Sequence, residues 1–326
     1  MRRREFMTLI AGTLVGGRPL GVRAQQIRSV IGWLSEGSAA SDGDWLAAFR
    51  QGLREDGFVG GQNVLIEYRW ADDHTDRLRG LADDLAARGV AVIVALGTPA
   101  ALAAKEATAT IPVVFYVSAD PVRAGLVTSL NRPVDNVTGI AGFTDMMIAK
   151  RLELLTELAP SAAIFGLLLN KNNPNSQNRR SDFVSAARQL GREVRIFEVS
   201  ALNDLEKVFA TAAEETAGGL VVQNDTLFLN HAEQLAALAS RLRLPTIYED
   251  RENVQAGGLM SYGANRKERL RTLGIYTSRI LKGERPSALP VDQPTAFELI
   301  VNLKTARAIG ITMPPALLAR ADEVIE

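Results

Sequence analysis

Residues 90–107 read VAVIVALGTPAALAAKEA, and this stretch decides the fold. A β-branched, apolar run ends at Gly97, and a strong helix-forming segment follows from Ala100. Between them, Thr98 can cap the helix and Pro99 can occupy its first position. A strand that passes through glycine directly into a helix is the repeating unit of a parallel sheet covered by helices. The stretch therefore predicts an α/β fold of the Rossmann-like kind.

The same alternation extends along the chain in both directions. An early helix has Trp45, Phe49 and Leu53 at helical spacing, with Asp42 or Asp44 as its N-cap. Around Gly142 the pattern restarts with a helix at 145–158. The predicted strands are 30–34, 64–69, 90–96, 113–117 and 137–141 before this restart, and 164–169, 194–198, 220–222, 246–248 and 259–262 after it.

Two similar α/β lobes with parallel sheets, joined by a hinge, are the economical interpretation of this restart. The linking segments are not low-complexity tracts, so we expect the chain to cross between lobes several times. We expect the hinge at 139–142, with further crossings near 262–266 and 290–294. We assign 27–142 plus about 264–290 to lobe 1, and 143–263 plus about 291–326 to lobe 2.

The N-terminus predicts export. Three arginines within residues 1–4 precede the apolar stretch 6–15, and Val22-Arg23-Ala24 supplies the small residues that a signal peptidase requires. We interpret 1–24 as a cleaved signal peptide and expect a periplasmic protein. The stretch RREFM at 3–7 also resembles a twin-arginine signal, although Arg18 and Pro19 interrupt the apolar region. The alternative is a disordered cytosolic arm.

Composition excludes several classes of function. Lysine plus arginine equals aspartate plus glutamate at 37 each, so the chain lacks the broad positive field of nucleic-acid binders. No helix-turn-helix segment precedes the first strand. Cysteine is absent, which excludes disulfides and thiolate metal sites. The two histidines, His74 and His231, lie in separate lobes, and we expect both to be exposed. We expect no metal, cofactor or catalytic residue, and a monomer.

A ligand in such a fold binds at the carboxyl ends of the parallel strands, where helix N-termini present free N–H groups. Polar residues that follow predicted strands are therefore the candidate binding residues. They are Ser35, Gly97, Thr98, Ser118 and Asp120 in the first lobe, and Asn170, Asn175, Asn224, Asp225, Glu249 and Tyr262 in the second.

Each candidate also has a purely structural interpretation. The segment at Thr98 is also typical of an ordinary capped helix, and Asp120 before proline is a common turn former. Glu249 and Asp250 could equally hold Arg251 in a surface ion pair. The aromatic residues that could line a cleft are Trp33, Tyr248 and Tyr262, which are more often found in a core. These alternatives stay open on the sequence alone.

Many segments taken together resemble one family. The chain is similar, from residue 31 to 326, to the ABC-transporter substrate-binding proteins that include tryptophan and tyrosine binders. An example is AGGLMSYG at 256–263. The other matching segments are 61–64, 67–70, 110–115, 120–122, 136–139, 150–155, 293–295, 297–299 and 302–306.

The resemblance implies a type I periplasmic binding fold, a small polar solute held between the lobes, and a partner permease with its ATPase. It places the ligand-contacting loops at Ser35, Thr98, Ser118, Asp120, Asn175, Asn224, Asp225 and Tyr262. Two loops depart from the family pattern. Asn170-Lys171 stands where relatives often have Asn-Pro, and Asp225-Thr226 where they often have Asp-Pro. This resemblance favours an amino-acid-like solute, which includes the aromatic amino acids.

Two other functions are weighed against solute transport. A hydrolase or isomerase on a doubly wound sheet would need an acid–base pair among Asp120, Asp225 and Glu249. A ligand-sensing domain would dock on a membrane-bound kinase or chemoreceptor instead of a permease. For transport we expect lobe closure around the solute, which shifts the population toward a form that the permease recognises.

Overall fold

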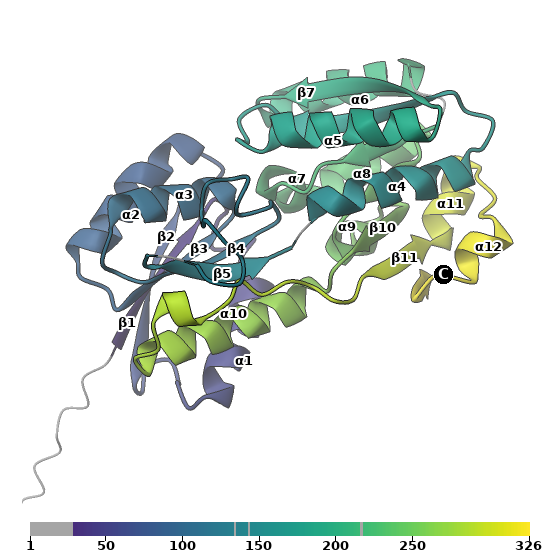
Figure 1. The fold of residues 1–326 in the computed structure, drawn as a ribbon. Coiled ribbons are helices and arrows are strands. Elements are labelled where there is room, and N and C mark those ends of the chain that lie inside the picture. The colour runs from purple at the N-terminus through teal and green to yellow at the C-terminus, as the bar shows by residue number, and fades with distance from the viewer. Residues whose placement is uncertain (1–28, 134, 143, 216–217) are drawn as a thin grey trace, which may run out of the picture.

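The computed structural model describes residues 29–326, apart from residues 134, 143 and 216–217 and the side chains of 144–146. The predicted signal peptide at 1–24 lies outside these residues. The described strands form two separate sheets, each covered by helices (Figure 1). Nine of the ten strand pairings among the described residues are parallel and one, between β10 and β11, is antiparallel, so the predicted α/β class with mainly parallel sheets is confirmed.

The first sheet has five parallel strands within the described residues, in the spatial order β2-β1-β3-β4-β5. This order reverses between β1 and β3, so the loops that follow these two strands diverge and leave a crevice at the strands' carboxyl ends. The strands span Ser29–Ser35 (β1), Val64–Trp70 (β2), Val92–Leu96 (β3), Val113–Val117 (β4) and Val137–Ala141 (β5).

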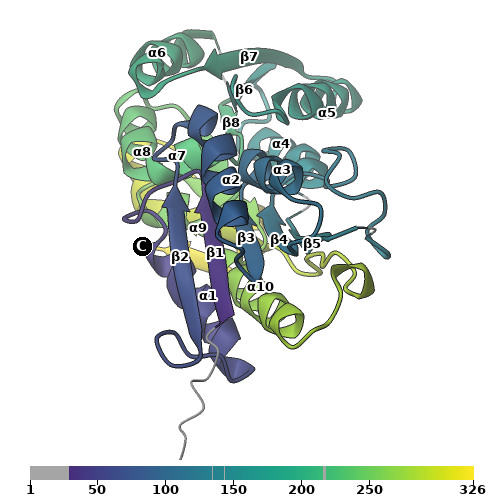
Figure 2. The ribbon, with the colours of Figure 1, turned by 90° about the vertical axis from the view of Figure 1, so that its left-hand side faces the viewer.

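Helices cover both faces of this sheet. α2 and α3 lie on one face, and α1 and α10 lie together on the other (Figures 1 and 2). α10 comes from far along the chain, yet it packs against α1. The bounds are Gly43–Glu55 (α1), Thr75–Arg77 (the short turn η1), Leu78–Ala87 (α2), Thr98–Ala107 (α3) and Arg266–Leu281 (α10).

The contact between α1 and α10 depends on two glycines. A Cβ atom added at Gly52 would lie 1.9 Å from the carbonyl oxygen of Arg271, and one added at Gly274 would lie 2.2 Å from that of Phe49. The two helix backbones therefore touch directly, which no larger residue at these positions permits. Phe49 and Leu273 fill the apolar space between these helices and the sheet.

The second sheet has seven strands within the described residues, in the order β12-β11-β10-β9-β8-β6-β7. Its part β7-β6-β8-β9-β10 repeats the strand order of the first sheet, so a second reversal lies between β6 and β8. β11 runs antiparallel to β10. The strands span Ile164–Asn170 (β6), Glu193–Val199 (β7), Leu220–Val222 (β8), Thr246–Tyr248 (β9), Met260–Gly263 (β10), Glu298–Asn302 (β11) and Glu323–Ile325 (β12).

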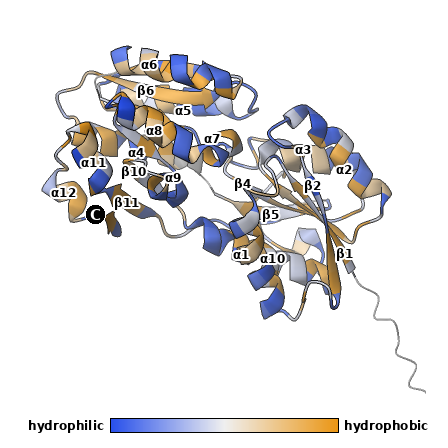
Figure 3. Cartoon of the chain, turned by 180° about the vertical axis from the view of Figure 1, so that it is seen from behind, coloured by the Kyte–Doolittle hydropathy of each residue, from blue (hydrophilic) through white to orange (hydrophobic). Residues whose placement is uncertain are grey.

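The helices of this half pack against both faces of the second sheet, and apolar residues concentrate along the strands (Figure 3). Their bounds are Thr144–Leu158 (α4), Ser176–Gln189 (α5), Leu202–Asp204 (η2), Leu205–Glu215 (α6), Thr226–Asn230 (α7), Ala232–Arg241 (α8), Arg251–Gln255 (α9), Leu303–Ile309 (α11) and Pro315–Leu318 (α12). Among the described residues, no helix combines the length and apolarity that a membrane crossing needs.

The chain passes between the two sheets at three places in the described part. The first follows β5, the second lies between β10 and α10, and the third follows η3 (Pro286–Ala288). In the third, the backbone of Asp292 bonds to the edge strand β5: its N–H donates to Gly139 at 3.0 Å, and its carbonyl accepts from Ala141 at 2.9 Å. This crossing is therefore anchored to the first sheet before it enters the second.

The strands predicted from the sequence are all present within a residue or two of their expected ends, whereas β11 and β12 were not predicted. One capping prediction is wrong, and another holds for the position but not for the hydrogen bond. α3 begins at Thr98 itself with Gly97 as its N-cap, and no side chain caps it. Asp42 occupies the N-cap position of α1, but its carboxylate accepts bonds from Trp33 Nε1 at 2.8 Å and Trp70 Nε1 at 2.9 Å.

Candidate functional site

The crevice of the first sheet is built by the ends of β1 and β3. Ser35 is fully buried, and its Oγ accepts a hydrogen bond from the Gly37 N–H at 3.2 Å. Glu36 follows and is only 5% exposed. Gly97 has φ of +92°, and a Cβ atom there would lie 1.9 Å from Glu36 Oε1. Glycine at this position therefore lets the Glu36 carboxyl lie across the end of β3.

The crevice of the second sheet is built by the ends of β6 and β8. Asn170 Nδ2 donates to Asp225 Oδ1 at 3.0 Å, and Asn173 Nδ2 donates to Asp225 Oδ2 at 2.6 Å. Asp225 also caps α7 by accepting from the Leu227 N–H. Burial raises the pKa of the Asp225 carboxyl, and these three donors oppose that rise. The donors fix the orientation of a carboxylate that is 5% exposed.

The two crevices face each other across a cavity of about 490 Å3. This volume lies within the range of roughly 300–1,000 Å3 that small-molecule sites occupy. Its described lining includes five carboxylates and no lysine or arginine. The lining residues are Glu36, Asp72, Asp73, His74, Thr75, Asp76, Asn170, Asn172, Ser200, Ala201, Leu202, Asn203, Asp225, Leu227 and His231.

A smaller cavity of about 20 Å3 lies deeper between the sheets and shares Glu36 and Asp225 with the large one. Its volume suits roughly one water molecule. Two aromatic rings contribute to its walls. The lining residues are Glu36, Trp45, Leu96, Gly97, Thr98, Tyr116, Ser118, Asn173, Asn224, Asp225, Thr226 and Arg266.

Arg266, the first residue of α10, links the two halves beside the small cavity. Its guanidinium makes a two-pronged ion pair with Asp250, at 3.0 Å from Nε to Oδ1 and 2.8 Å from Nη2 to Oδ2. It also lies over the rings of Trp45 at 4.7 Å and Tyr116 at 5.5 Å. Burial alone would lower the pKa of Arg266, but the Asp250 carboxylate more than offsets this. Asn224 Nδ2 donates to the same carboxylate at 2.6 Å.

Further polar contacts join the first sheet's loops to the helices of the second sheet. They connect the two crevices in this structure. The contacts are Arg179 Nη2 to Ser118 Oγ at 3.1 Å, Arg123 Nη1 to Asp182 Oδ2 at 2.9 Å, Asn230 Nδ2 to Asp73 Oδ1 at 2.8 Å, and His231 Nε2 to Asp73 Oδ2 at 3.4 Å.

The structure brings several predicted binding residues together at these cavities. Asn170 lines the large cavity and Asp225 lines both. Gly97, Thr98, Ser118 and Asn224 line the small one. Ser35 is buried at the edge of this group and supports the Glu36 loop through Gly37.

Four other predicted residues line neither cavity. Asp120 Oδ1 accepts from the N–H groups of Val122 and Arg123, which is the turn role given above as an alternative. Asn175 lies buried at the start of α5.

Glu249 and Tyr262 both contact the buried Arg151. Its Nη2 lies 3.0 Å from Glu249 Oε2, and its Nε donates to the Tyr262 carbonyl at 2.9 Å. Burial raises the pKa of Glu249, and the Arg151 guanidinium opposes this. The Tyr262 ring stacks on Phe297 with 6.0 Å between centroids. The alternative role of Glu249 and Asp250, a surface ion pair with Arg251, is not found in the described residues, where Arg251 pairs with Glu298 and Glu323.

The aromatic residues near the cleft differ from those expected. Trp33 and Tyr248 are core residues, 0% and 1% exposed, whereas Trp45 and Tyr116 line the small cavity. Both lie within or at the end of predicted elements, at positions that periodicity assigns to the core.

The charged residues that bridge the cleft were not predicted from the sequence. Arg179 and Arg266 are buried arginines near helix starts, and Arg266 directly follows a predicted strand and its crossing. That placement is the signal that could have indicated Arg266. His231 was expected to be exposed, but it is partly buried against Asp73. Among the described residues, no group of three or more histidines, cysteines or carboxylates is placed to hold a metal ion.

Two reversed sheets that face each other across a polar cavity define the class of two-lobed periplasmic binding proteins of type I. A family profile described as "ABC transporter substrate binding protein" matches residues 41–325. The chain belongs to this family. It is 26% identical over 263 residues to a tyrosine-binding protein of Clostridioides difficile (strain R20291), covering 81% of this chain and 75% of that protein.

Solved structures show the same fold. The chain matches a Streptococcus pneumoniae ABC domain in complex with L-Trp at 25% identity and a TM-score of 0.84, covering 91% of this chain and 100% of that one. It matches the ligand-free, open structure of a substrate-binding protein with adhesive properties from Clostridium difficile at 27% identity and a TM-score of 0.66, covering 91% and 99%. At equal coverage, the two sheets thus lie closer to the arrangement in the tryptophan complex than to the open one.

Proposed function

We propose that this chain is the extracytoplasmic solute-binding component of an ABC importer and that it holds an amino-acid-like solute between its two sheets. The observation that carries this proposal is the position of both strand-order reversals at one cavity of about 490 Å3. Each sheet contributes polar groups to that cavity, so a solute could bond to both at once. The family membership supports the same role.

The mechanism that we propose is closure of two lobes. The lobes would be the first sheet with α1, α2, α3 and α10, and the second sheet with the remaining helices. Opening breaks the contacts of Arg179 with Ser118 and of Asn230 with Asp73, which lie on opposite sides of the cleft. A solute that bonds to both lobes shifts the population toward the closed form, which the permease then recognises.

The amino-acid class of solute rests on the relatives and on the lining. One relative is named a tyrosine-binding protein and another was solved with L-Trp. The cleft of this chain combines carboxylates, amides and the rings of Trp45 and Tyr116, which suits a zwitterion with an apolar or aromatic side chain. We further propose that the chain binds this solute without transforming it.

We also propose that residues 1–24 direct export and are removed, so that the protein acts in the periplasm as a monomer beside a permease and its ATPase. The twin-arginine stretch at 3–7 would send the folded protein through the membrane. Sizing of the mature chain in the periplasmic fraction tests both statements. A cytosolic chain that retains residue 1 would contradict them.

The binding proposal is tested by calorimetry of the purified chain, from residue 25, with a panel of amino acids. We expect a dissociation constant of roughly micromolar or tighter for at least one of them, which corresponds to about 8 kcal/mol. Asp225→Ala should abolish this binding because it removes the hub of the second crevice, and Thr98→Val should weaken it. Unchanged binding in both variants would show that the site lies elsewhere.

A turnover assay on the same solute separates binding from catalysis. We expect the solute to be recovered unchanged after long incubation with the protein. Conversion that is lost in Asp225→Asn would support the hydrolase or isomerase alternative instead.

A further inference from the structure

The Glu36 carboxyl is the feature of the cleft that solute binding in general does not explain. The residue is 5% exposed, and its Oε1 has no hydrogen-bond partner among the described residues. It lines both cavities. Gly97 provides the space for it, since a Cβ atom there would lie 1.9 Å from this oxygen. A carboxyl group kept buried without a partner is unfavourable unless something else bonds to it.

Asp225 lies on the other side of the same two cavities. Its oxygens accept from Asn170, Asn173 and the Leu227 N–H, which fix the carboxylate in place. Two carboxylate oxygens offer about four acceptor positions, so one remains for a further donor. Asp225 and Glu36 are close enough that the charge of one raises the pKa of the other. Each comes from a different sheet.

The charges around this pair are mostly negative. Asp73, from the loop after β2, also raises the pKa of Glu36 and contacts Asn230 and His231. Groups of opposite sign act from a distance: Arg179 on α5 lowers the pKa of Asp225, and Arg266 on α10 is already held by Asp250. Two neutral groups, the Thr226 hydroxyl and the Ala100 N–H of α3, lower the pKa of Glu36.

We propose that Glu36 and Asp225 form a split cation site, one carboxylate from each lobe, which binds the ammonium group of the solute. The proposal rests on the proposed function and narrows it to solutes that carry a primary amine. An ammonium group has three donors and makes charge-assisted bonds to both carboxylates. A metal ion fits less well, because the described residues offer no group of three suitable ligands.

The split site also explains how closure depends on the solute. Without a cation, closing the cleft brings two like charges together in a buried place, which opposes closure. A bound ammonium group removes this opposition, and so does a proton. In this structure burial and the charge of Asp225 raise the pKa of the Glu36 carboxyl. Opening the cleft would hydrate Glu36 and separate it from Asp225, so we expect its pKa to be lower in an open form and falling pH to favour closure of the ligand-free protein.

The first test measures binding of three matched probes by calorimetry at neutral pH: L-tyrosine, tyramine and 3-(4-hydroxyphenyl)propionate. The first two carry the ammonium group and the third lacks it. We expect the third to bind at least tenfold more weakly than L-tyrosine. Glu36→Gln should weaken the two amines by roughly ten- to a hundredfold and leave the third unchanged. Asp83→Asn, which removes an exposed carboxylate on α2 that lines neither cavity, should change each by less than about twofold.

Equal binding of the deaminated probe and L-tyrosine would overturn the split site while leaving the proposed transport role intact. So would equal effects of Glu36→Gln and Asp83→Asn. If the wild-type chain binds none of the three probes, the aromatic amino-acid class proposed above fails, and the split site is judged by the second test.

The second test needs no solute. The chain has no cysteine, so spin labels at Gly80→Cys on α2 and Lys207→Cys on α6, both exposed, report the distance between the lobes. We expect shorter distances at pH 5 than at pH 8 in the ligand-free protein, and a much smaller difference in the same protein with Glu36→Gln. The contact of His231 with Asp73 is retained in both proteins and cancels in the comparison. A pH-independent distance, or an equal shift with Glu36→Gln, would overturn the proposal.

Discussion

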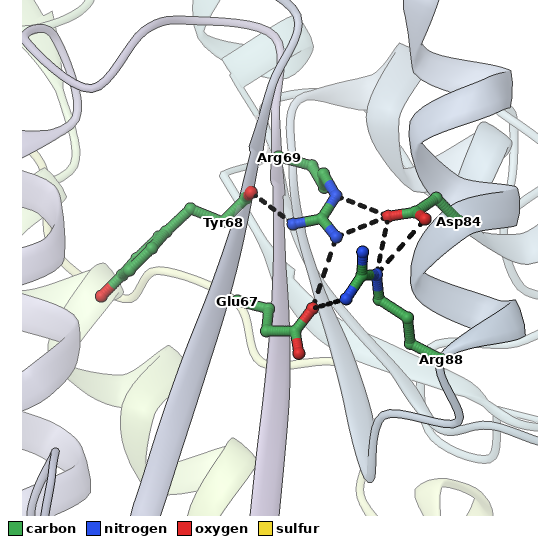
Figure 4. A network of polar contacts seen from close by, with 5 residues as sticks. All are labelled: Glu67, Tyr68, Arg69, Asp84 and Arg88. Atoms are coloured by element: carbon green, nitrogen blue, oxygen red, sulfur yellow. Dashed lines mark hydrogen bonds and ion pairs between the residues drawn. The ribbon is translucent and has the colours of Figure 1, made fainter.

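Two charge networks of similar geometry lie in different surroundings. Arg266 pairs with Asp250 at the cleft with 3.0 and 2.8 Å bonds, and the two side chains are 6% and 4% exposed. On the outer edge of the first sheet, Arg69 pairs with Asp84 at 2.7 Å, within a group that includes Glu67 and Arg88, and here the exposures are 19% and 44% (Figure 4). Bond lengths alone do not decide how much the loss of each pair would destabilise the protein. Exposure to water decides it.

The difference assigns them different roles. A buried pair brings little net stability, but removing one partner leaves an uncompensated charge. An exposed pair is screened by water and salt, and losing it matters little. The cleft network therefore fixes the relative position of the two halves. The edge network of Figure 4 mainly gives an edge strand of the sheet a polar, water-exposed surface.

The largest expected effect comes from Arg266→Ala. It strands Asp250 in a buried place and removes the cation from the rings of Trp45 and Tyr116, so we expect unfolding in urea to cost about 3–5 kcal/mol less than for the wild type. Equilibrium denaturation followed by circular dichroism measures this. A loss below about 1 kcal/mol would mean that Asp250 is hydrated and that the two networks are alike.

A smaller effect is expected from Gly97→Ala, also at the cleft. The backbone there has φ of +92°, which an alanine adopts only with strain, and the new Cβ atom would meet Glu36 Oε1. We expect a loss of about 1–3 kcal/mol together with weaker solute binding. Gly80→Ala is the matched control at an exposed position in the first turn of α2, where nothing lies within 4 Å, and it should stabilise the protein by roughly 0.5–1 kcal/mol. Equal effects of the two changes would contradict the structure of the Gly97 turn.

For the edge network, Arg69→Ala should leave the urea midpoint within experimental error of the wild type. Both side chains already contact water, and Asp84 keeps Arg88 as a second partner. Repeating the measurement at 1 M salt should remove any residual difference. A loss as large as that of Arg266→Ala would break the comparison on which these predictions depend.

The smallest effect is a titration. The hydrogen bonds from Arg69 lower the pKa of the Asp84 carboxyl, so any stability it adds is present above its ordinary pKa and is lost as the pH falls through the lowered value. NMR titration of Asp84 should show its pKa rising toward the ordinary value in Arg69→Ala. An unchanged pKa would mean that the pair is not formed in solution.

The strands of this protein could be predicted from its sequence, whereas the contacts of its buried polar side chains could not. Strands such as Val113–Val117 can be predicted because buried parallel strands are continuous runs of β-branched residues. β12 was not predicted because it has only three residues and pairs with a single strand, β11, at the edge of the sheet. The sequence could predict that polar residues lie together at the carboxyl ends of the strands, because strand order places those ends at one edge of each sheet. The sequence could not predict which hydrogen-bond partner each side chain has. Asp42, for example, accepts a bond from Trp70, which is 28 residues away.

The packing of α10 against the first sheet has a consequence for biosynthesis. The last strand of that sheet ends at Ala141, yet the helix that covers α1 is complete only at Leu281, which is 140 residues later (281 minus 141). At about 5–20 residues per second, roughly 7–28 s pass between the two events. During this time Phe49 and Leu53 lack the apolar residues of α10 that cover them in the finished protein.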